Sequence, residues 1–177
     1  LKNTFDVCST RNNETAFIYR KGFNVHSIKN RNNTKKGFTA KKLRELTLWK
    51  LDFADTEEAL IICEGEIDVL SFEEQGINNA VSVPFGSNAF DWLETDFHIL
   101  KKFKEIIIAV DSDEAGNECK RELLKRLPEV DSLKCIDWGE YKDANEVLLD
   151  GGDIQSYIDG AKDVDHQYYV NLEKDTD

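Results

Sequence analysis

The chain has 177 residues, 40% of them hydrophobic and 33% charged, with a formal net charge of −12. This composition is typical of a globular protein. No apolar run approaches the ~20 residues that a membrane-spanning helix needs, and residues 1–15 lack the apolar stretch of a signal peptide. The cysteines form no C-x-x-C pair, which argues against a disulfide framework and a zinc site. They are Cys8, Cys63, Cys119 and Cys135.

Charge is divided unevenly along the chain. Residues 1–50 hold 12 Lys and Arg against 3 Asp and Glu, a net charge of +9, whereas residues 51–177 hold 11 against 32, a net charge of −21. A basic segment beside an acidic body indicates a polyanionic partner for the basic part. Because the chain begins at Leu1 and contains no Met, we expect it to be a piece of a longer protein.

The first 54 residues are predicted to form a small, basic, strand-containing subdomain. Residues 15–20 and 23–29 have the composition of two strands, and Lys21-Gly22 between them predicts a hairpin turn. A polar loop over 30–34 and a basic stretch over 35–42 follow. The apolar residues of 43–51 are expected to pack this subdomain onto the next one.

Residues 55–162 alternate between strand-like and helix-like segments, which predicts an α/β domain with a parallel sheet and helices on both faces. Residues 163–177 are acidic and without pattern, and are interpreted as a tail or linker. The expected strands are 59–63, 80–83, 105–110 and 133–136, and the expected helices are about 67–75, part of 88–102, 114–127, 145–149 and 153–161.

Two short acidic segments directly follow two of the apolar strands. Glu64-Gly65-Glu66-Ile67-Asp68 comes after 59–63, and Asp111-Ser112-Asp113-Glu114-Ala115-Gly116 comes after 105–110. Ligands bind at this end of the strands in open α/β sheets, and carboxylates gathered there need a cation between them. The natural candidate is Mg²⁺ or Mn²⁺, which takes oxygen ligands and leaves positions for phosphate. If Glu64 and Asp111 share a metal, their strands are neighbours, and the strand order is 2-1-3-4.

The two segments resemble the toprim signature, an E-G-x-x-D motif followed by a D-x-D-x-x-G motif. Ser82-Val83-Pro84-Phe85-Gly86 and Lys142-Asp143-Ala144-Asn145-Glu146 narrow the resemblance to the primase half of phage primase–helicases and the related Twinkle proteins. The resemblance covers about residues 15–160. It implies template-directed synthesis of RNA primers on single-stranded DNA, with NTPs as substrates.

The resemblance also implies roles for individual residues. Glu64 is the general base for the attacking 3′-hydroxyl or a metal ligand, and Asp143 joins the metal site as a third aspartate. The D-x-D spacing itself lets Asp111 and Asp113 hold one cation or bridge two. The lack of a side chain would let Gly65 turn the backbone sharply and Gly116 bring the next helix close. Gly86 would let backbone N–H groups approach a phosphate, or belong to a plain Pro-containing turn, and Asp68 would hold the loop rather than the metal.

Each carboxylate also has a structural alternative. Acidic residues are favoured at helix N-termini, and we prefer this interpretation, a solvated N-terminus, for Glu66. Ser112, Asp113 or Asp143 can cap helices. Lys142 could contact a triphosphate, and its structural alternative is an ordinary exposed lysine. The resemblance places basic residues of the first subdomain on template and nucleotide phosphates. The corresponding residues are Lys29, Arg31, Lys35 and Lys36.

Two other functions remain open at this stage: a toprim nuclease using the same carboxylates, and a non-catalytic DNA-binding module of a replicative helicase. No G-x-x-x-x-G-K-[ST] sequence occurs, so the expected helicase partner domain is not in this chain. We expect Trp49, Trp92 and Trp138 to pack in the core, and the cysteines to be reduced. The expected location is intracellular, in a bacterium or phage-infected cell, with an organelle left open.

Overall fold

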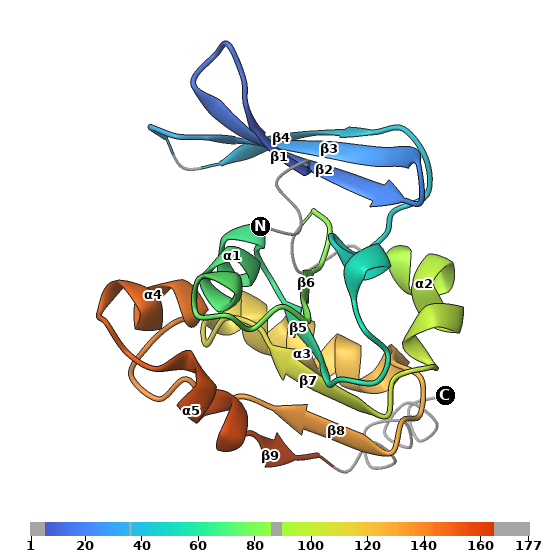
Figure 1. The fold of residues 1–177 in the computed structure, drawn as a ribbon, viewed down its shortest axis with the longest axis vertical. Helices are drawn as coiled ribbons and strands as arrows, with labels where there is room; N and C mark the ends of the chain where they lie inside the picture. The colour runs from blue at the N-terminus through green and yellow to red at the C-terminus, as the bar shows by residue number, and fades with distance from the viewer. Residues whose placement is uncertain (1–5, 36, 86–89, 165–177) are drawn as a thin grey trace.

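Two β-sheets, one above the other in Figure 1, make up the fold in this computed structural model, which describes residues 6–35, 37–85 and 90–164. The upper sheet belongs to the basic N-terminal part of the chain. The lower sheet carries helices on both faces. The lower sheet positions the acidic segments, and the upper sheet lies over them.

The upper sheet is antiparallel, with the strand order β1-β2-β3-β4. The predicted hairpin is β2 (Glu14–Lys21) and β3 (Asn24–Asn32), and its turn is Gly22-Phe23, one residue later than predicted. Gly22 has φ +59, a left-handed conformation that favours glycine. β1 (Val7–Ser9) and β4 (Phe38–Lys42) were not predicted. All five residues of β4 are exposed, so no apolar alternation marks this strand in the sequence.

The lower sheet has the order β6-β5-β7-β8-β9. Its first four strands are parallel and confirm the predicted order 2-1-3-4, but the prediction of a four-stranded parallel sheet is wrong, since the two-residue β9 (Lys162–Asp163) pairs antiparallel with β8. A strand this short has no periodicity to detect. The parallel strands are β5 (Leu60–Cys63), β6 (Ala80–Ser82), β7 (Glu105–Ala109) and β8 (Ser132–Cys135).

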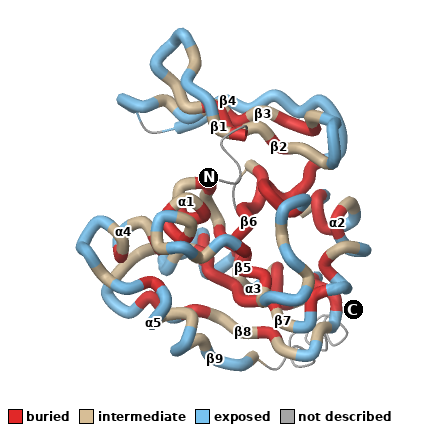
Figure 2. Tube along the Cα trace, viewed as in Figure 1, coloured by how far each residue is buried: buried red, intermediate tan, exposed pale blue. Residues whose placement is uncertain are grey.

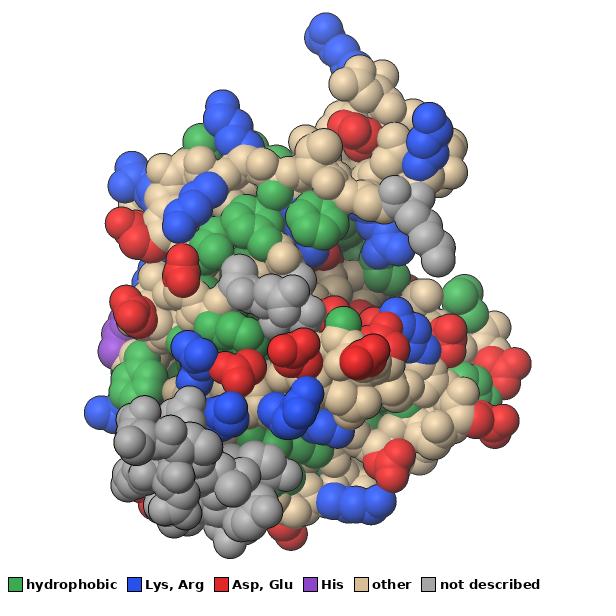
Figure 3. Space-filling view, turned by 180° about the vertical axis from the view of Figure 1, so that it is seen from behind, with side chains coloured by type: hydrophobic (Ala, Val, Ile, Leu, Met, Phe, Trp, Pro, Cys, Tyr) green, Lys and Arg blue, Asp and Glu red, His purple; other side chains and the backbone are tan. Residues whose placement is uncertain are grey.

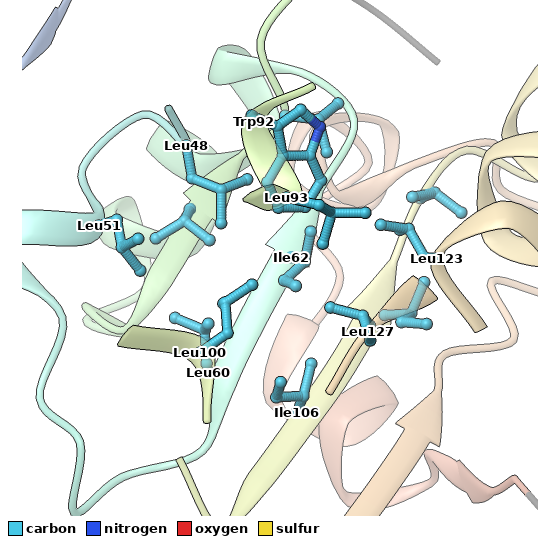
Figure 4. Packing of buried hydrophobic residues seen from close by; sticks show 14 of the residues in the cluster. Leu48, Leu51, Leu60, Ile62, Trp92, Leu93, Leu100, Ile106, Leu123 and Leu127 are labelled. Carbon is cyan, nitrogen blue, oxygen red and sulfur yellow. The ribbon is translucent and has the colours of Figure 1, made fainter. Parts of the chain in front are cut away.

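Alternate residues of the central strands β5 and β7 face two different hydrophobic clusters. Ile62 and Ile106 pack with the helices α2 (Trp92–Leu100) and α3 (Glu114–Arg126), as Figure 4 shows. Ile61 and Ile107 pack with residues of the three remaining helices. Both strands are therefore buried on both faces, in red in Figure 2, which explains why they lack polar alternation. The remaining helices are α1 (Glu66–Glu74), α4 (Ala144–Leu149) and α5 (Ile154–Asp159).

The segment between the two sheets packs into both clusters, as predicted for 43–51. Leu48 belongs to the first cluster, and Trp49 to the second, where its ring meets Phe17 of β2 edge-on at 5.4 Å. Trp49 also forms a β-bridge with Ser82, next to a short 3₁₀ helix at Leu51–Phe53. Because residues of both sheets pack in the same cluster, the packing does not mark a domain boundary between residues 54 and 55, and that boundary stays a prediction.

Other expectations about the core are confirmed. The three tryptophans are buried, with at most 2% exposure. All four cysteines are free thiols, and Cys63 is buried at the end of β5. Within the described ranges, no helix has the length and apolar character that a bilayer crossing requires.

Candidate functional site

The acidic segments meet at the carboxyl edge of the lower sheet. Because Cys63 of β5 pairs with Ala109 of the parallel strand β7, Glu64 and Asp111 leave the sheet side by side. The loop after β8 is fixed to the same place. Ser112 donates its backbone N–H to the carbonyl oxygen of Lys142 at 2.8 Å, and its hydroxyl to that of Tyr141 at 3.0 Å. The fold thus brings together three chain segments that the sequence predicted to share a site.

A lysine lies between two of the carboxylates. The ammonium nitrogen of Lys142 is 2.7 Å from Asp111 Oδ2 and 3.1 Å from Asp113 Oδ2. Burial raises the pKa of Asp111, and the Lys142 ammonium opposes that increase. The pKa of Asp113 is lowered, first by the backbone N–H of Gly116 and then by Lys142. The two aspartates therefore favour a positive charge between them.

Glu64 lies beside this pair with less compensation. Burial raises its pKa to about 7, and repulsion by Asp111 and Asp113 adds to the increase. Its Oε2 atom is buried and has no hydrogen-bond partner among the described residues. A carboxyl group with a pKa near 7 can exchange a proton near neutral pH, and a buried oxygen without a partner favours a ligand.

The chemistry of these donors fits a hard divalent cation, because oxygen atoms are the ligands that Mg²⁺ and Mn²⁺ take. Two observations support this fit. Glu64 Oε2 has no partner in the described part of the chain, and the Lys142 ammonium group already places a positive charge between Asp111 and Asp113. In the placement seen over residues 6–35, 37–85 and 90–164, however, no three His, Cys, Asp or Glu side chains converge enough to enclose a metal ion. The carboxylates would have to rearrange around a cation.

Two aspartates at helix starts act as caps. Asp113 accepts a hydrogen bond from the Gly116 N–H at 3.0 Å, and Asp143 accepts one from the Glu146 N–H at 2.8 Å. The capping alternative therefore holds for both. It does not exclude a ligand role, since a capping carboxylate keeps further lone pairs.

Asp68 is buried in the first turn of α1. Burial raises its pKa to about 8, and Asp143 and Asp111 add to the increase. Its Oδ1 accepts a long hydrogen bond, 3.4 Å, from the N–H of Asn145 at the start of α4. Asp68 thus connects α1 to the loop that carries Asp143.

The two glycines of the motifs provide space. A Cβ on Gly116 would lie 2.0 Å from the carbonyl oxygen of Asp111, so α3 approaches the strand end only because residue 116 has no side chain. Gly65 has φ −119, which any residue adopts, so the prediction that it is needed for a sharp turn is wrong. A Cβ there would instead lie 2.9 Å from Asp68 Oδ2. Gly86 lies outside the described residues.

Glu66 is buried, so the prediction that it lies at a solvated helix N-terminus is wrong. Glu66 is 2% exposed, and its Oε1 atom is 3.0 Å from the ammonium nitrogen of Lys29. The hydroxyl group of Tyr19 also donates to Glu66. Lys29 is therefore buried in an ion pair that joins β3 to the start of α1, two residues after Glu64. No local pattern signals this contact, because the two partners are 37 residues apart.

Of the remaining predicted phosphate-binding residues, Arg31 lies in β3 and Lys35 shortly after it. Arg31 and Lys35 are exposed, and Lys36 lies outside the described residues. A hollow of about 320 Å³ opens next to Asp111 and is lined by Lys120 and Lys162 among others. A larger hollow of about 1220 Å³ lies at the C-terminal end of α1, and none of the predicted site residues lines it.

Comparison with known proteins agrees with this arrangement. Residues 61–148 match the Toprim-like family model. The Twinkle homolog protein, chloroplastic/mitochondrial, of Arabidopsis thaliana is 35% identical over 160 residues, and the Primase homolog protein of the same plant is 34% identical over 158 residues. Both matches cover 77% of this chain, which spans only 22% and 46% of the two relatives.

Among solved structures, the chain is similar to the primase fragment of the bacteriophage T7 primase-helicase protein. The TM-score is 0.75 at 25% identity, and the match covers 86% of this chain and 66% of the T7 fragment. That likeness extends over both sheets of the present fold. Residues 61–148 are thus a toprim-like domain, and the chain as a whole is similar to the primase fragment of a primase–helicase and to part of a Twinkle-type protein.

Proposed function

We propose that this chain is the RNA-polymerising core of a DNA primase that works with a helicase domain. The single observation that carries the proposal is the carboxylate cluster at the strand ends, where Glu64 has a pKa of about 7 beside Asp111 and Asp113. The similar proteins, a primase homolog and the primase fragment of a primase–helicase, support the same activity. The intracellular location stays a prediction.

In this proposal the 3′-hydroxyl oxygen of an RNA strand attacks the α-phosphorus of an NTP. The new P–O bond forms as the bond to pyrophosphate breaks, and Glu64 accepts the proton of the hydroxyl group. Asp111, Asp113 and Asp143 would hold Mg²⁺ or Mn²⁺, with Glu64 as a further ligand where it does not act as the base. The cation would supply positive charge to the phosphate oxygens.

The basic residues have a matching role. Lys142 lies within 3.1 Å of both aspartates, so it is placed to pair with a triphosphate when a cation takes over the aspartates. Arg31, Lys35 and Lys36 would bind template and nucleotide phosphates. Lys29 would fix the upper sheet over the site through Glu66.

The test is incorporation of labelled NTPs on mixed single-stranded DNA templates with Mg²⁺ or Mn²⁺. Wild type should yield short RNA products, and Asp111→Asn and Glu64→Gln should each reduce the yield by more than about 100-fold, because losing a side chain that contacts the metal costs more than losing one that only orients it. Asp131→Asn is the matched control, since Asp131 is exposed at the opposite end of β8.

The failures of this test separate the alternatives. Degraded template without RNA product would identify a nuclease that uses the same carboxylates. Bound but intact template, with no RNA product even when the helicase and other domains of the full-length protein are present, would identify a non-catalytic DNA-binding module.

A further inference from the structure

One face of the upper sheet combines basic and aromatic side chains at its free edge. In the antiparallel register, Arg31 pairs with Phe38 and Lys29 with Ala40. Paired residues and every second residue along a strand share a face, so Lys29, Arg31 and Phe38 lie on one face. β4 pairs only with β3, so this face ends at an edge without a further described strand.

This is the face that meets the lower domain. Phe17 pairs with Lys29, and Tyr19 with Ser27, so both aromatic residues share the face. Both are fully buried, and Tyr19 donates to Glu66 of α1. Figure 3 shows hydrophobic and basic side chains along the side of the upper sheet that faces the lower domain, with acidic side chains gathered opposite them.

Phe38 continues this face beyond the buried core. Its side chain is 48% exposed, which is unusual for a phenylalanine in a strand, where aromatic residues are normally packed. The Lys29 ammonium lies 4.6 Å from the centroid of its ring. The same ammonium binds Glu66, two residues after Glu64. Phe38 is therefore connected through Lys29 and Glu66 to the start of α1, two residues from Glu64.

A second exposed phenylalanine shows that exposure alone is not the signal. Phe23 is fully exposed at the β2–β3 turn, and none of the described cations lies over its ring. Over the part of the chain that the structure describes, Phe38 alone combines a half-exposed ring, a neighbouring buried lysine and an exposed arginine paired with it across the sheet. Aromatic platforms flanked by basic side chains bind single strands, because bases stack on the ring while the basic groups pair with phosphates.

We propose that Phe38 is a stacking platform for a base of single-stranded DNA, with Arg31 on the adjoining phosphate. The identity of the polymer rests on the proposed function. The platform places the template strand on the upper sheet, across from the carboxylate cluster, so a templating base reaches the site from the side opposite the metal ligands.

The test compares two oligonucleotides without NTP or metal, so that it does not depend on catalysis. One is a labelled oligo-dT of about ten nucleotides, and the other is an abasic strand of equal length with the same phosphates. Wild type should bind oligo-dT at least about fivefold more tightly by fluorescence anisotropy, since stacking contributes ~1–3 kcal/mol per base. Phe38→Ala should lose this preference and keep its affinity for the abasic strand.

Two variants control the experiment. Phe38→Trp keeps an aromatic face and should retain the preference, which separates stacking from misfolding. Phe23→Ala removes an equally large exposed ring on the same sheet and should change neither affinity.

The proposal is overturned if wild type binds both strands equally or binds neither, or if Phe38→Ala weakens binding to both strands equally. RNA synthesis by a protein without base preference would overturn only this inference. A Phe38-dependent base preference in a protein that makes no RNA would contradict only the proposed function.

Discussion

Two acidic regions of the molecule are buried in opposite ways. In α2, Asp96 is fully buried, and the Thr47 hydroxyl, which donates to its carboxylate, is 2.9 Å from both oxygens. It also accepts from the Leu48 N–H at 2.7 Å, and the Lys21 ammonium is 3.3 Å away. At the strand ends, Glu64 has a buried oxygen without a partner among the described residues.

The two carboxylates differ in their neighbours, and this difference separates a structural role from a ligand-binding one. Burial raises the pKa of both groups, but the partners of Asp96 oppose the increase, whereas the neighbours of Glu64 are mostly acidic and add to it. A satisfied carboxylate holds the structure together, here by tying β2 and the linker to α2. An unsatisfied one lowers stability and keeps its lone pairs for a ligand.

The largest expected effect comes from removing the hydrogen bonds of Asp96. Asp96→Ala removes the acceptor for Leu48 and Thr47 and leaves a buried N–H and the Lys21 charge unpaired. We expect the free energy of unfolding to fall by about 3 kcal/mol, measured by urea denaturation. Asp131→Ala, an exposed control, should change it by less than ~0.5 kcal/mol. Equal effects of the two substitutions would contradict the structural role of Asp96.

The next effect concerns the close packing of α3 against the backbone of Asp111. Gly116→Ala places a methyl group 2.0 Å from the Asp111 carbonyl oxygen, so α3 must move away from the strand end. We expect a loss of ~1–3 kcal/mol in the free energy of unfolding. Gly160→Ala is the matched control, because its nearest contact would be 3.3 Å, and it should cost less. A Gly116→Ala protein as stable as Gly160→Ala would show that the close approach is unimportant.

The smallest effect is a pH dependence. The pKa of Asp68 is about 8 in the folded protein against 3.8 for the free group, so between these values the folded state binds more protons than the unfolded state. Its contribution therefore lowers stability as the pH rises through this range. Asp68→Asn should gain stability relative to wild type, on the order of 1 kcal/mol more at pH 9 than at pH 5.

This comparison is made by chemical denaturation with EDTA present at both pH values. Parallel stability profiles for wild type and Asp68→Asn would mean that Asp68 is not held protonated in the fold.

The sequence predicted those parts of the molecule that rest on local pattern. Apolar runs followed by acidic motifs identified the central strands and placed Glu64 and Asp111 at one edge of the sheet. Contacts between distant segments were beyond prediction. Neither the Lys29–Glu66 ion pair nor the Asp96 network leaves a periodic signal, and β4 and β9 lack the apolar alternation by which strands are found. The need for Gly65 was predicted for the wrong reason, since the space for Asp68 is visible only in three dimensions.

The most direct test is whether a divalent cation stabilises the protein through the carboxylates at the strand ends, Glu64, Asp111 and Asp113. The free energy of unfolding should be measured with and without Mg²⁺ or Mn²⁺ for wild type, Asp111→Asn and Asp131→Asn. Binding to the folded state stabilises it as the free cation concentration exceeds the dissociation constant, so wild type and Asp131→Asn should gain stability while Asp111→Asn gains little. An equal gain in all three proteins, or no gain in any, would contradict the claim that the strand-end carboxylates form a metal site.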